Sequence, residues 1–343
     1  AVTENAATDL GASTVSGTFG ITSGGAITDS GTQAITGAAT FTNTAGTNDA
    51  ITLDDASNAF SGTVTLSTDS GSAVTVVDTT ALDLLALSAA SLSVTAGGAV
   101  TDSGTLAITG ATTISASGQD ITLDEAASTF GTLALTGVNV AVTENAATDL
   151  GATTVSGTFG ITSGGAITDS GTQTITGAAT FTNTAGTNDA ITLDDVSNAF
   201  SGTVTFSTDS GSAVTVVDTT ALDLLALSAA SLSVTSGGAV TDSGTLAITG
   251  ATTISASGQD ITLDEAASTF GTLALTGANV AVTENAATDL GASTVGGTLG
   301  ITSAGAVTDS GTLAITGATT ISASGQDITL DEAASTFGTL ALT

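Results

Sequence analysis

The stretch that decides the fold is ASLSVTAGGAVTDSGTLAITGATTISASGQDITLDEAASTF, residues 90–130. Short runs of Val, Ile, Leu and Thr alternate with small polar residues in it, and Gly, Ser or Asp interrupts them at short intervals. Alternation with a period of two is typical of half-buried β-strands. Gly, Ser, Asn and Asp supply the turns between them without any proline. The local pattern therefore predicts short β-strands joined by tight turns.

This stretch belongs to a long internal repeat, because AVTENAATDL begins at Ala1, Ala141 and Ala281. Residues 1–140 and 141–280 differ at six positions, all exchanges among small or apolar residues. The third copy, 281–343, is shorter: residues 281–317 match 1–37, and residues 318–343 match 111–136. A stack of equivalent layers tolerates the loss of whole layers. We therefore expect 1–343 to be one continuous segment of a longer solenoid array.

Each full copy divides into six segments of similar length: 17–36, 37–61, 62–88, 89–109, 110–130 and 131–156. Most of them hold short strand-like runs separated by turn residues. This predicts an all-β fold, a parallel β-helix (β-solenoid) with about three short strands per rung of roughly 20–27 residues, and we expect it to be right-handed. Rungs stack about 4.8 Å apart, so that backbone N–H and C=O groups pair with the rungs on either side.

Two features within the repeat have more than one interpretation. The Leu- and Ala-rich residues 79–90 are expected to be coil with pieces of strand, and a short helix is the alternative. Phenylalanines recur near the ends of the segments, before Gly or Ser-Gly, and are expected to plug the interior or pack at corners. They are Phe60, Phe130, Phe200, Phe270 and Phe337.

The composition excludes several classes of function. The chain has 32 acidic residues and no Lys, Arg or His, which gives a net charge of -32. Without cationic side chains it has nothing to neutralise phosphates, so we expect no nucleic-acid partner. Without His, Cys or Lys it lacks the usual general bases, thiol nucleophiles, imine-forming amines and zinc ligands, so we expect no enzyme. No apolar run is long enough to cross a bilayer, so we expect no membrane insertion.

Acidic residues recur after the second strand of many segments, and they are the candidate metal ligands. Calcium takes six to eight oxygen ligands and is the cation we expect where acids and turn carbonyls converge. The alternative is a solvated column of turns screened by ordinary salt. A pair of carboxylates could also serve a glycosidase, but the pair Asp54–Asp55 recurs at Asp194–Asp195, which favours a scaffold. The candidates are Asp29, Asp54, Asp55, Asp78, Asp102, Asp124, Glu125 and Glu144.

The string from Ala90 to Gly151 resembles the giant β-strand-repeat surface proteins of Gram-negative bacteria, which include filamentous-haemagglutinin-like proteins and other large adhesins. The resemblance covers the whole chain and lies in the style of the repeat. It implies a secreted β-helix that serves as a stalk, fibre or adhesive matrix. The chain departs from many such proteins because it lacks every Lys and Arg.

We therefore expect a non-catalytic, polyanionic and protease-resistant extracellular fibre or adhesin stalk at a bacterial cell surface. Its expected partners are further copies of itself, end to end or side by side, and cell-surface glycans. The alternative is a repeated binding surface. Such a surface would belong to a calcium-dependent matrix or surface-layer protein, to a glycan-binding adhesin or, through its threonine-rich strands, to an ice-binding protein.

Overall fold

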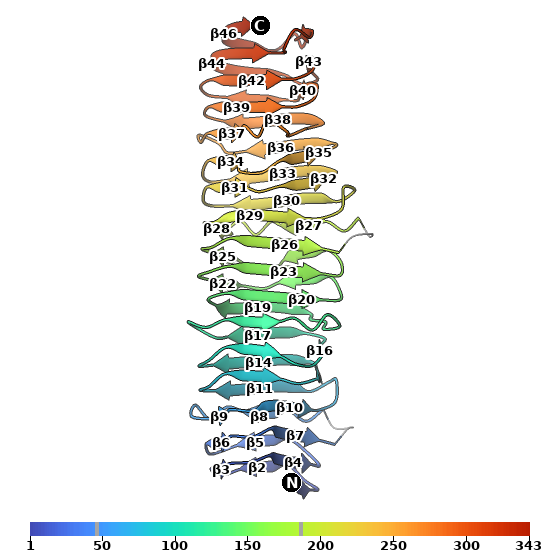
Figure 1. Cartoon of the computed structure of the whole chain (residues 1–343), viewed down its shortest axis with the longest axis vertical. Helices are drawn as coiled ribbons and strands as arrows, with labels where there is room; N and C mark the ends of the chain where they lie inside the picture. Colours follow the sequence, from blue (N-terminus) through green and yellow to red (C-terminus); the bar gives the residue numbers. More distant parts are fainter. Residues whose placement is uncertain (45–47, 185–187) are drawn as a thin grey trace. The chain divides into compact units, whose positions relative to one another are not determined.

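The computed structural model describes residues 1–44, 48–184 and 188–343. The chain divides into two compact units, unit 1 (Ala1–Gly165) and unit 2 (Ala166–Thr343), and each is described by itself. In the described ranges the regular structure is β-strand throughout, with no α-helix. Within each unit, strands of successive rungs lie parallel and in register (Figure 1). The prediction of an all-β, parallel β-solenoid is confirmed.

Unit 1 is built around two long columns of paired strands, which we call face A and face B. Face A comprises β1 (Val2–Glu4), β4 (Phe19–Ser23), β7 (Ala39–Asn43), β10 (Thr63–Ser67), β12 (Leu82–Leu84), β15 (Val100–Asp102), β18 (Ile121–Leu123), β20 (Val140–Glu144) and β23 (Phe159–Ser163). Face B comprises β2 (Thr8–Leu10), β5 (Ile27–Asp29), β8 (Ile51–Leu53), β11 (Ala73–Asp78), β14 (Ser91–Ala96), β17 (Ala111–Ser115), β19 (Thr132–Gly137) and β21 (Thr148–Leu150). Shorter strands close the rungs: β3 (Ser13–Val15), β6 (Gln33–Ile35), β9 (Ala59–Phe60), β13 (Leu87–Ala89), β16 (Leu106–Ile108) and β22 (Thr153–Val155).

Unit 2 repeats this arrangement with the equivalent strands. Its face A comprises β26 (Ala179–Asn183), β29 (Thr203–Ser207), β31 (Leu222–Leu224), β34 (Val240–Asp242), β37 (Ile261–Leu263), β39 (Val280–Glu284) and β42 (Leu299–Ser303). Its face B comprises β24 (Ile167–Asp169), β27 (Ile191–Leu193), β30 (Ala213–Asp218), β33 (Ser231–Ser236), β36 (Ala251–Ser255), β38 (Thr272–Gly277), β40 (Thr288–Leu290), β43 (Val307–Asp309) and β45 (Ile328–Thr329). The remaining strands are β25 (Gln173–Ile175), β28 (Ala199–Phe200), β32 (Leu227–Ala229), β35 (Leu246–Ile248), β41 (Ser293–Val295), β44 (Leu313–Ser322) and β46 (Thr336–Leu342).

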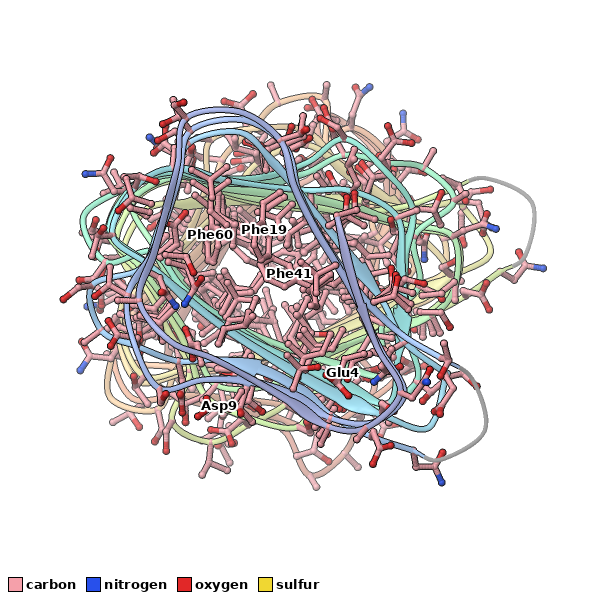
Figure 2. All side chains as sticks on the ribbon, turned by 90° about the horizontal axis from the view of Figure 1, so that it is seen from below. Glu4, Asp9, Phe19, Phe41 and Phe60 are labelled. Carbon is pink, nitrogen blue, oxygen red and sulfur yellow. The ribbon has the colours of Figure 1, made fainter. Side chains whose placement is uncertain are left out.

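The core follows from the alternation in the sequence. On face B, Ile27 pairs with Ile51 and Ile51 pairs with Val74, so that one apolar column is sealed inside unit 1. Burying each such side chain contributes about 1.5–3 kcal/mol. Residues one position along the strand face outward instead. Figure 2 views the rungs from below and shows Phe19, Phe41 and Phe60 in the interior. The rings of Phe41 and Phe60 meet edge to face, with their centroids 5.8 Å apart.

The repeat contains seven rungs, where the segmentation of the sequence predicts six. Seven successive pairings along face A lead from β1 to β20, the strand in which the second copy begins. The predicted segment 62–88 contains two face A strands, β10 and β12, so it spans a rung boundary. Rungs differ in length, because the stretch between the paired residues Leu84 and Asp102 is shorter than the stretch between Phe41 and Leu66.

The extra rung arises because some rungs have two strands instead of three. Between β10 and β12 the chain forms only β11, and between β19 and β21 it forms only β20. Among the described residues, β9 therefore has no strand above it, and its last residue, Phe60, needs other partners for its backbone. The Leu- and Ala-rich residues 79–90 form β12 and β13 joined by coil, which confirms the expectation for this stretch.

The shortened third copy resumes on a different face, and this corrects the expectation that whole rungs are missing. The sequence ATTIS forms β36 at 251–255, which pairs with β33 and β38 on face B. The same sequence at 318–322 is the end of β44 and pairs with β42 on face A. Both faces therefore accept the same strand sequence.

Candidate functional site

The acidic residue at the end of several strands points inward. In β5 and β15 an aspartate follows two residues after an inward Ile27 or Val100, so the period of two places its side chain on the same side. Asp29 is 8% exposed and Asp102 is 5% exposed. We call Asp29, Asp102, Asp169, Asp242 and Asp309 the strand-end aspartates.

Each strand-end aspartate accepts a hydrogen bond from the backbone of the next rung. The N–H of Asp54 lies 2.8 Å from Asp29 Oδ1, and the N–H of Asp124 lies 2.8 Å from Asp102 Oδ1. The same bond, also 2.8 Å, recurs in unit 2 at Asp169, Asp242 and Asp309. Each donor belongs to an acidic pair that turns outward after its strand, and in unit 1 these pairs are Asp54–Asp55 and Asp124–Glu125.

A second set of buried acids caps phenylalanines that end a short strand, as Phe60 ends β9, or that follow an isolated bridge, as Phe130 follows Thr129. The N–H of Phe60 donates to Asp78 Oδ1 at 3.1 Å, and the hydroxyl of Thr80 donates to the Phe60 carbonyl at 3.1 Å. The N–H of Phe130 donates to Glu144 Oε1 at 2.6 Å. We call Asp78, Glu144 and their equivalents in unit 2, Asp218 and Glu284, the capping carboxylates; the last two accept the N–H groups of Phe200 and Phe270.

The capping carboxylates replace a missing strand. A buried N–H left without a partner costs about 1–3 kcal/mol, and these side chains supply the acceptor that an absent strand would have supplied. Each of them is 2% exposed or less. Burial raises the pKa of all four carboxyls, although their hydrogen bonds favour the charged form.

The structure brings the eight predicted metal ligands together in two separate columns of unit 1. Along face B the strands β5, β8 and β11 are paired and precede or contain Asp29, Asp54, Asp55 and Asp78. Along face A the strands β15, β18 and β20 do the same for Asp102, Asp124, Glu125 and Glu144. Each column spans three rungs, and the residues that follow in register are Ala96 and Ser163.

No group of three or more acids close enough to hold a metal ion occurs among the described residues. Asp29, Asp78, Asp102 and Glu144 each accept a backbone N–H of the protein at one carboxylate oxygen. Asp54 and Asp124 are exposed. Calcium binding at these residues stays a prediction.

Reasoning from the sequence missed two residues that complete the acidic sites, Asn58 and Ser128. Both are fully buried, and each follows its acidic pair by three positions and precedes a buried Phe by two. The signal was available, because a polar residue that stands in the alternation of an inward-facing strand must find a partner inside. The two differ in chemistry, since an asparagine amide carries two N–H donors and a serine hydroxyl carries one O–H donor.

The outer surface offers shallow hollows with few ionisable groups. One hollow in unit 1 is lined by Ser61, Thr63, Asp83 and Thr101, among others, and an equivalent one recurs in unit 2. On face B the outward positions form a column of hydroxyl groups, Thr28, Thr52, Thr75, Ser93 and Thr113. No helix in the described part of the chain is long and apolar enough to cross a membrane.

Comparison with known proteins agrees with the repeat described above. The family model described as "Repeats of unknown function (DUF5649)" matches five successive stretches: 1–67, 71–136, 137–207, 211–276 and 277–343. Two matches lie within the first copy, the next two cover nearly all of the second copy and begin four residues before it, and the shortened third copy lies within the fifth. No curated protein and no solved structure matches the chain. Because these stretches cover nearly all of it, the chain belongs to the DUF5649 repeat family.

Proposed function

We propose that this repeat β-solenoid is a structural segment of an extracellular fibre or adhesin stalk at a bacterial cell surface, like the filamentous-haemagglutinin-like proteins that its sequence resembles. The observation that supports this best is the use of its buried acids. The strand-end aspartates and the capping carboxylates accept backbone N–H groups at the joints between rungs. Polar groups that hold a scaffold together in this way favour a mechanical role.

We propose that the chain is not an enzyme. The sequence has no His, Cys or Lys, so imidazole bases, thiol nucleophiles and imine-forming amines are missing, and its carboxylates recur with the repeat. A hollow such as the one beside Asp83 holds a single carboxylate among hydroxyl and methyl groups. A glycosidase needs two carboxyl groups on either side of a sugar.

A fibre requires self-association, end to end or side by side, and electron microscopy of the purified chain tests it. We expect unbranched filaments that persist in a chelator. A chain that remains monomeric at high concentration by sedimentation would count against the proposal. Surface labelling of intact producing cells tests the extracellular location, and the proposal requires the chain to be labelled without lysis.

The second candidate is a repeated calcium-binding surface, and the recurrence of the acidic pairs favours it. In unit 1 the pairs Asp54–Asp55 and Asp124–Glu125 occupy equivalent places above a buried aspartate. Calcium titration followed by thermal unfolding distinguishes the two candidates. A midpoint that rises by many degrees with calcium, and falls back with chelator, favours the binding surface.

A further inference from the structure

Each half of the repeat has a column of short strands of its own. The family matches 1–67 and 71–136 are the two halves of the first copy, and we call each of the five matched stretches a half copy. In the first, β3 pairs with β6 and β6 with β9. In the second, β13 pairs with β16, and Ala107 of β16 pairs with Thr129. Among the described residues no short strand pairs with a short strand of another half copy, so every pairing across a boundary involves a strand of face A or face B.

The boundary between two half copies falls inside a rung. β10 and β11 follow one another in the same rung, but β10 is the last strand of its half copy and β11 is the first strand of the next. β10 pairs with β7 below it at Val64–Ser67, and with β12 above it only at Thr63 and Val64. β11 pairs with β14 above it along Ala73–Asp78, and with β8 below it only at Val74–Val76. Each strand is therefore held mainly by its own half copy, and β29 and β30 in unit 2 pair in the same way.

The capping carboxylates reach across these boundaries. Asp78 is the last residue of β11 and belongs to the second half copy, whereas the Phe60 N–H that it accepts at 3.1 Å belongs to the first. Glu144 of the third half copy accepts the N–H of Phe130, which belongs to the second, at 2.6 Å. Their equivalents in unit 2 make the same crossing. Each half copy thus supplies one side chain that closes the short column of the half copy before it.

A boundary of this kind joins two rungs less firmly than the pairing inside a half copy. Inside the first half copy, the rungs of β4 and β7 are joined along face A, along face B and along the short column. At the boundary above them, the hydrogen bonds around Asp78 take the place of the short column. The stability of a stack is the sum of what each unit contributes and what couples it to its neighbours. A local opening is therefore expected to stop where the coupling is weakest.

We propose that each half copy opens and closes as one block, and that the capping carboxylates are latches that couple each block to the block before it. An opening that frees one strand then frees the other strands of its own half copy and leaves the neighbouring half copies paired. The blocks follow from the pairing of the strands, and they do not depend on the proposed fibre function.

Amide hydrogen exchange of the full chain tests the blocks, with a matched pair of variants. Ile35 and Ile108 are buried and occupy equivalent places in the short columns of the two half copies. The variant Ile35→Ala, Ile175→Ala loosens the first half of each full copy, and the variant Ile108→Ala, Ile248→Ala loosens the second half. Each change is made in both full copies because the copies yield nearly identical peptides.

The decisive comparison is between β10 and β11, which share a rung and belong to different half copies. Mass spectrometry follows peptides that cover each strand, and the shortened third copy lacks both sequences. We expect the first variant to exchange about tenfold faster or more in β10 and at the original rate in β11, and the second variant to show the reverse. If either variant accelerates both strands equally, or neither strand, the half copy is not the unit of opening and the proposal is wrong.

Removing the latches tests the coupling. Asp78→Ala with Asp218→Ala removes the carboxylate from two boundaries, and Asp83→Ala with Asp223→Ala is the control, since these acids bind exposed hydroxyl groups. We expect the urea transition of the first variant to broaden, because blocks that are coupled less tightly unfold over a wider range of urea. If its transition is as steep as that of the control, the capping carboxylates are not latches.

Discussion

At the scale of single residues, the capping carboxylates show how one column of paired strands can stop, as at β9, while faces A and B continue. Phe60 keeps both backbone groups paired, because Asp78 accepts from its N–H and Thr80 donates to its carbonyl. An acid in this place has an advantage over a neutral acceptor, since a charged oxygen forms the stronger hydrogen bond. Its disadvantage is the burial of charge, which appears as a raised pKa.

The cap of Phe60 gives the first prediction. Asp78→Ala leaves the buried Phe60 N–H without an acceptor, and we expect it to lower the free energy of unfolding by about 1–3 kcal/mol. Asp78→Asn keeps an acceptor oxygen and should cost less. Urea unfolding followed by circular dichroism measures both, with Asp83→Ala as the control, since Asp83 binds only exposed hydroxyls. Equal losses for the alanine variants at 78 and 83 would contradict the role of the cap.

The caps in the second half of the repeat predict a dependence on pH. Burial raises the pKa of Glu144 and Glu284, so their contribution to stability falls as the pH rises through the folded pKa. Glu144→Gln combined with Glu284→Gln removes these titrating groups and keeps an acceptor for Phe130 and Phe270. We expect thermal midpoints measured from pH 7 to pH 5 to rise less steeply in this variant than in the original chain. If the thermal midpoint of the variant depends on pH as steeply as that of the original chain, Glu144 and Glu284 do not contribute to the pH dependence.

Some of these residues could be predicted from the sequence and others could not. The alternation in Ile27-Thr28-Asp29 already places Asp29 on the inward side with Ile27, so its burial was open to prediction. The partner of Asp78 was not, because the rung that lacks a third strand leaves no mark on the local alternation. The different hydrogen bonding beside Asn58 and Ser128 could not be predicted either, because it depends on where Asp29 and Asp102 lie relative to them.

At the scale of elements, the corners between strands are as tightly specified as the core. Gly37 and Gly62 stand at the same corner in successive rungs, and a Cβ on Gly62 would lie 2.5 Å from the backbone carbon of Gly37. Stacked rungs bring backbone against backbone here, which leaves no room for a side chain. Gly17, at the same corner, has open space around its Cα.

This corner gives a prediction with a control in the same column. Gly62→Ala must displace the backbone of the rung below, and we expect it to lower the free energy of unfolding by about 1–3 kcal/mol. Gly17→Ala meets no atom within 4 Å and should be close to neutral. Denaturant unfolding of the two variants measures the difference. Similar values for both would mean that the corner adjusts freely.

The sequence ATTIS lies on face B at residues 251–255 and on face A at residues 318–322. This predicts that the repeat can also be shortened in the first copy. Deleting residues 38–110 from the first copy joins Gly37 to Ala111 and gives the sequence AITGATTIS, which the third copy has at residues 314–322. We expect the shortened chain to keep its β-sheet circular dichroism per residue and to unfold cooperatively. A control deletion of 38–113 also removes part of the strand β17 and should unfold at lower denaturant. If both deletions behave alike, the junction has no special value.

The strand order and the parallel pairing were predictable, because short alternating runs at regular intervals leave little choice of architecture. The count of rungs was not, since a predicted segment such as 62–88 holds strands of two rungs. The length of a segment does not show whether it is one long rung of three strands, or a short rung of two strands followed by the first strand of the next rung. The two cases differ in whether a capping carboxylate, such as Asp78 above Phe60, takes the place of the third strand.

At the scale of the whole molecule, charge is the dominant feature. A net charge of -32 without a single cationic side chain means that the acids repel one another throughout the chain. Salt therefore has the opposite effect to the one it has on proteins held by surface salt bridges. Screening relieves repulsion and removes no attraction.

This gives a prediction for the intact chain. We expect the thermal midpoint to rise by roughly 2–8 °C when sodium chloride increases from about 10 to about 300 mM. A series at constant ionic strength, with calcium replacing sodium, separates screening from specific binding. A midpoint that is unchanged by sodium chloride would show that the folded and unfolded chains suffer equal repulsion.

The acceptance of one strand sequence by either face has a consequence for inheritance. Copies that are nearly identical invite unequal crossing-over between their coding sequences, and most proteins would lose their fold at the recombination point. Here a crossover between equivalent places in the two halves joins the counterparts of Gly37 and Ala111, as at Gly317–Ala318, and the product still pairs rung to rung. Lineages that carry this repeat are therefore free to lengthen or shorten it in steps of about half a copy.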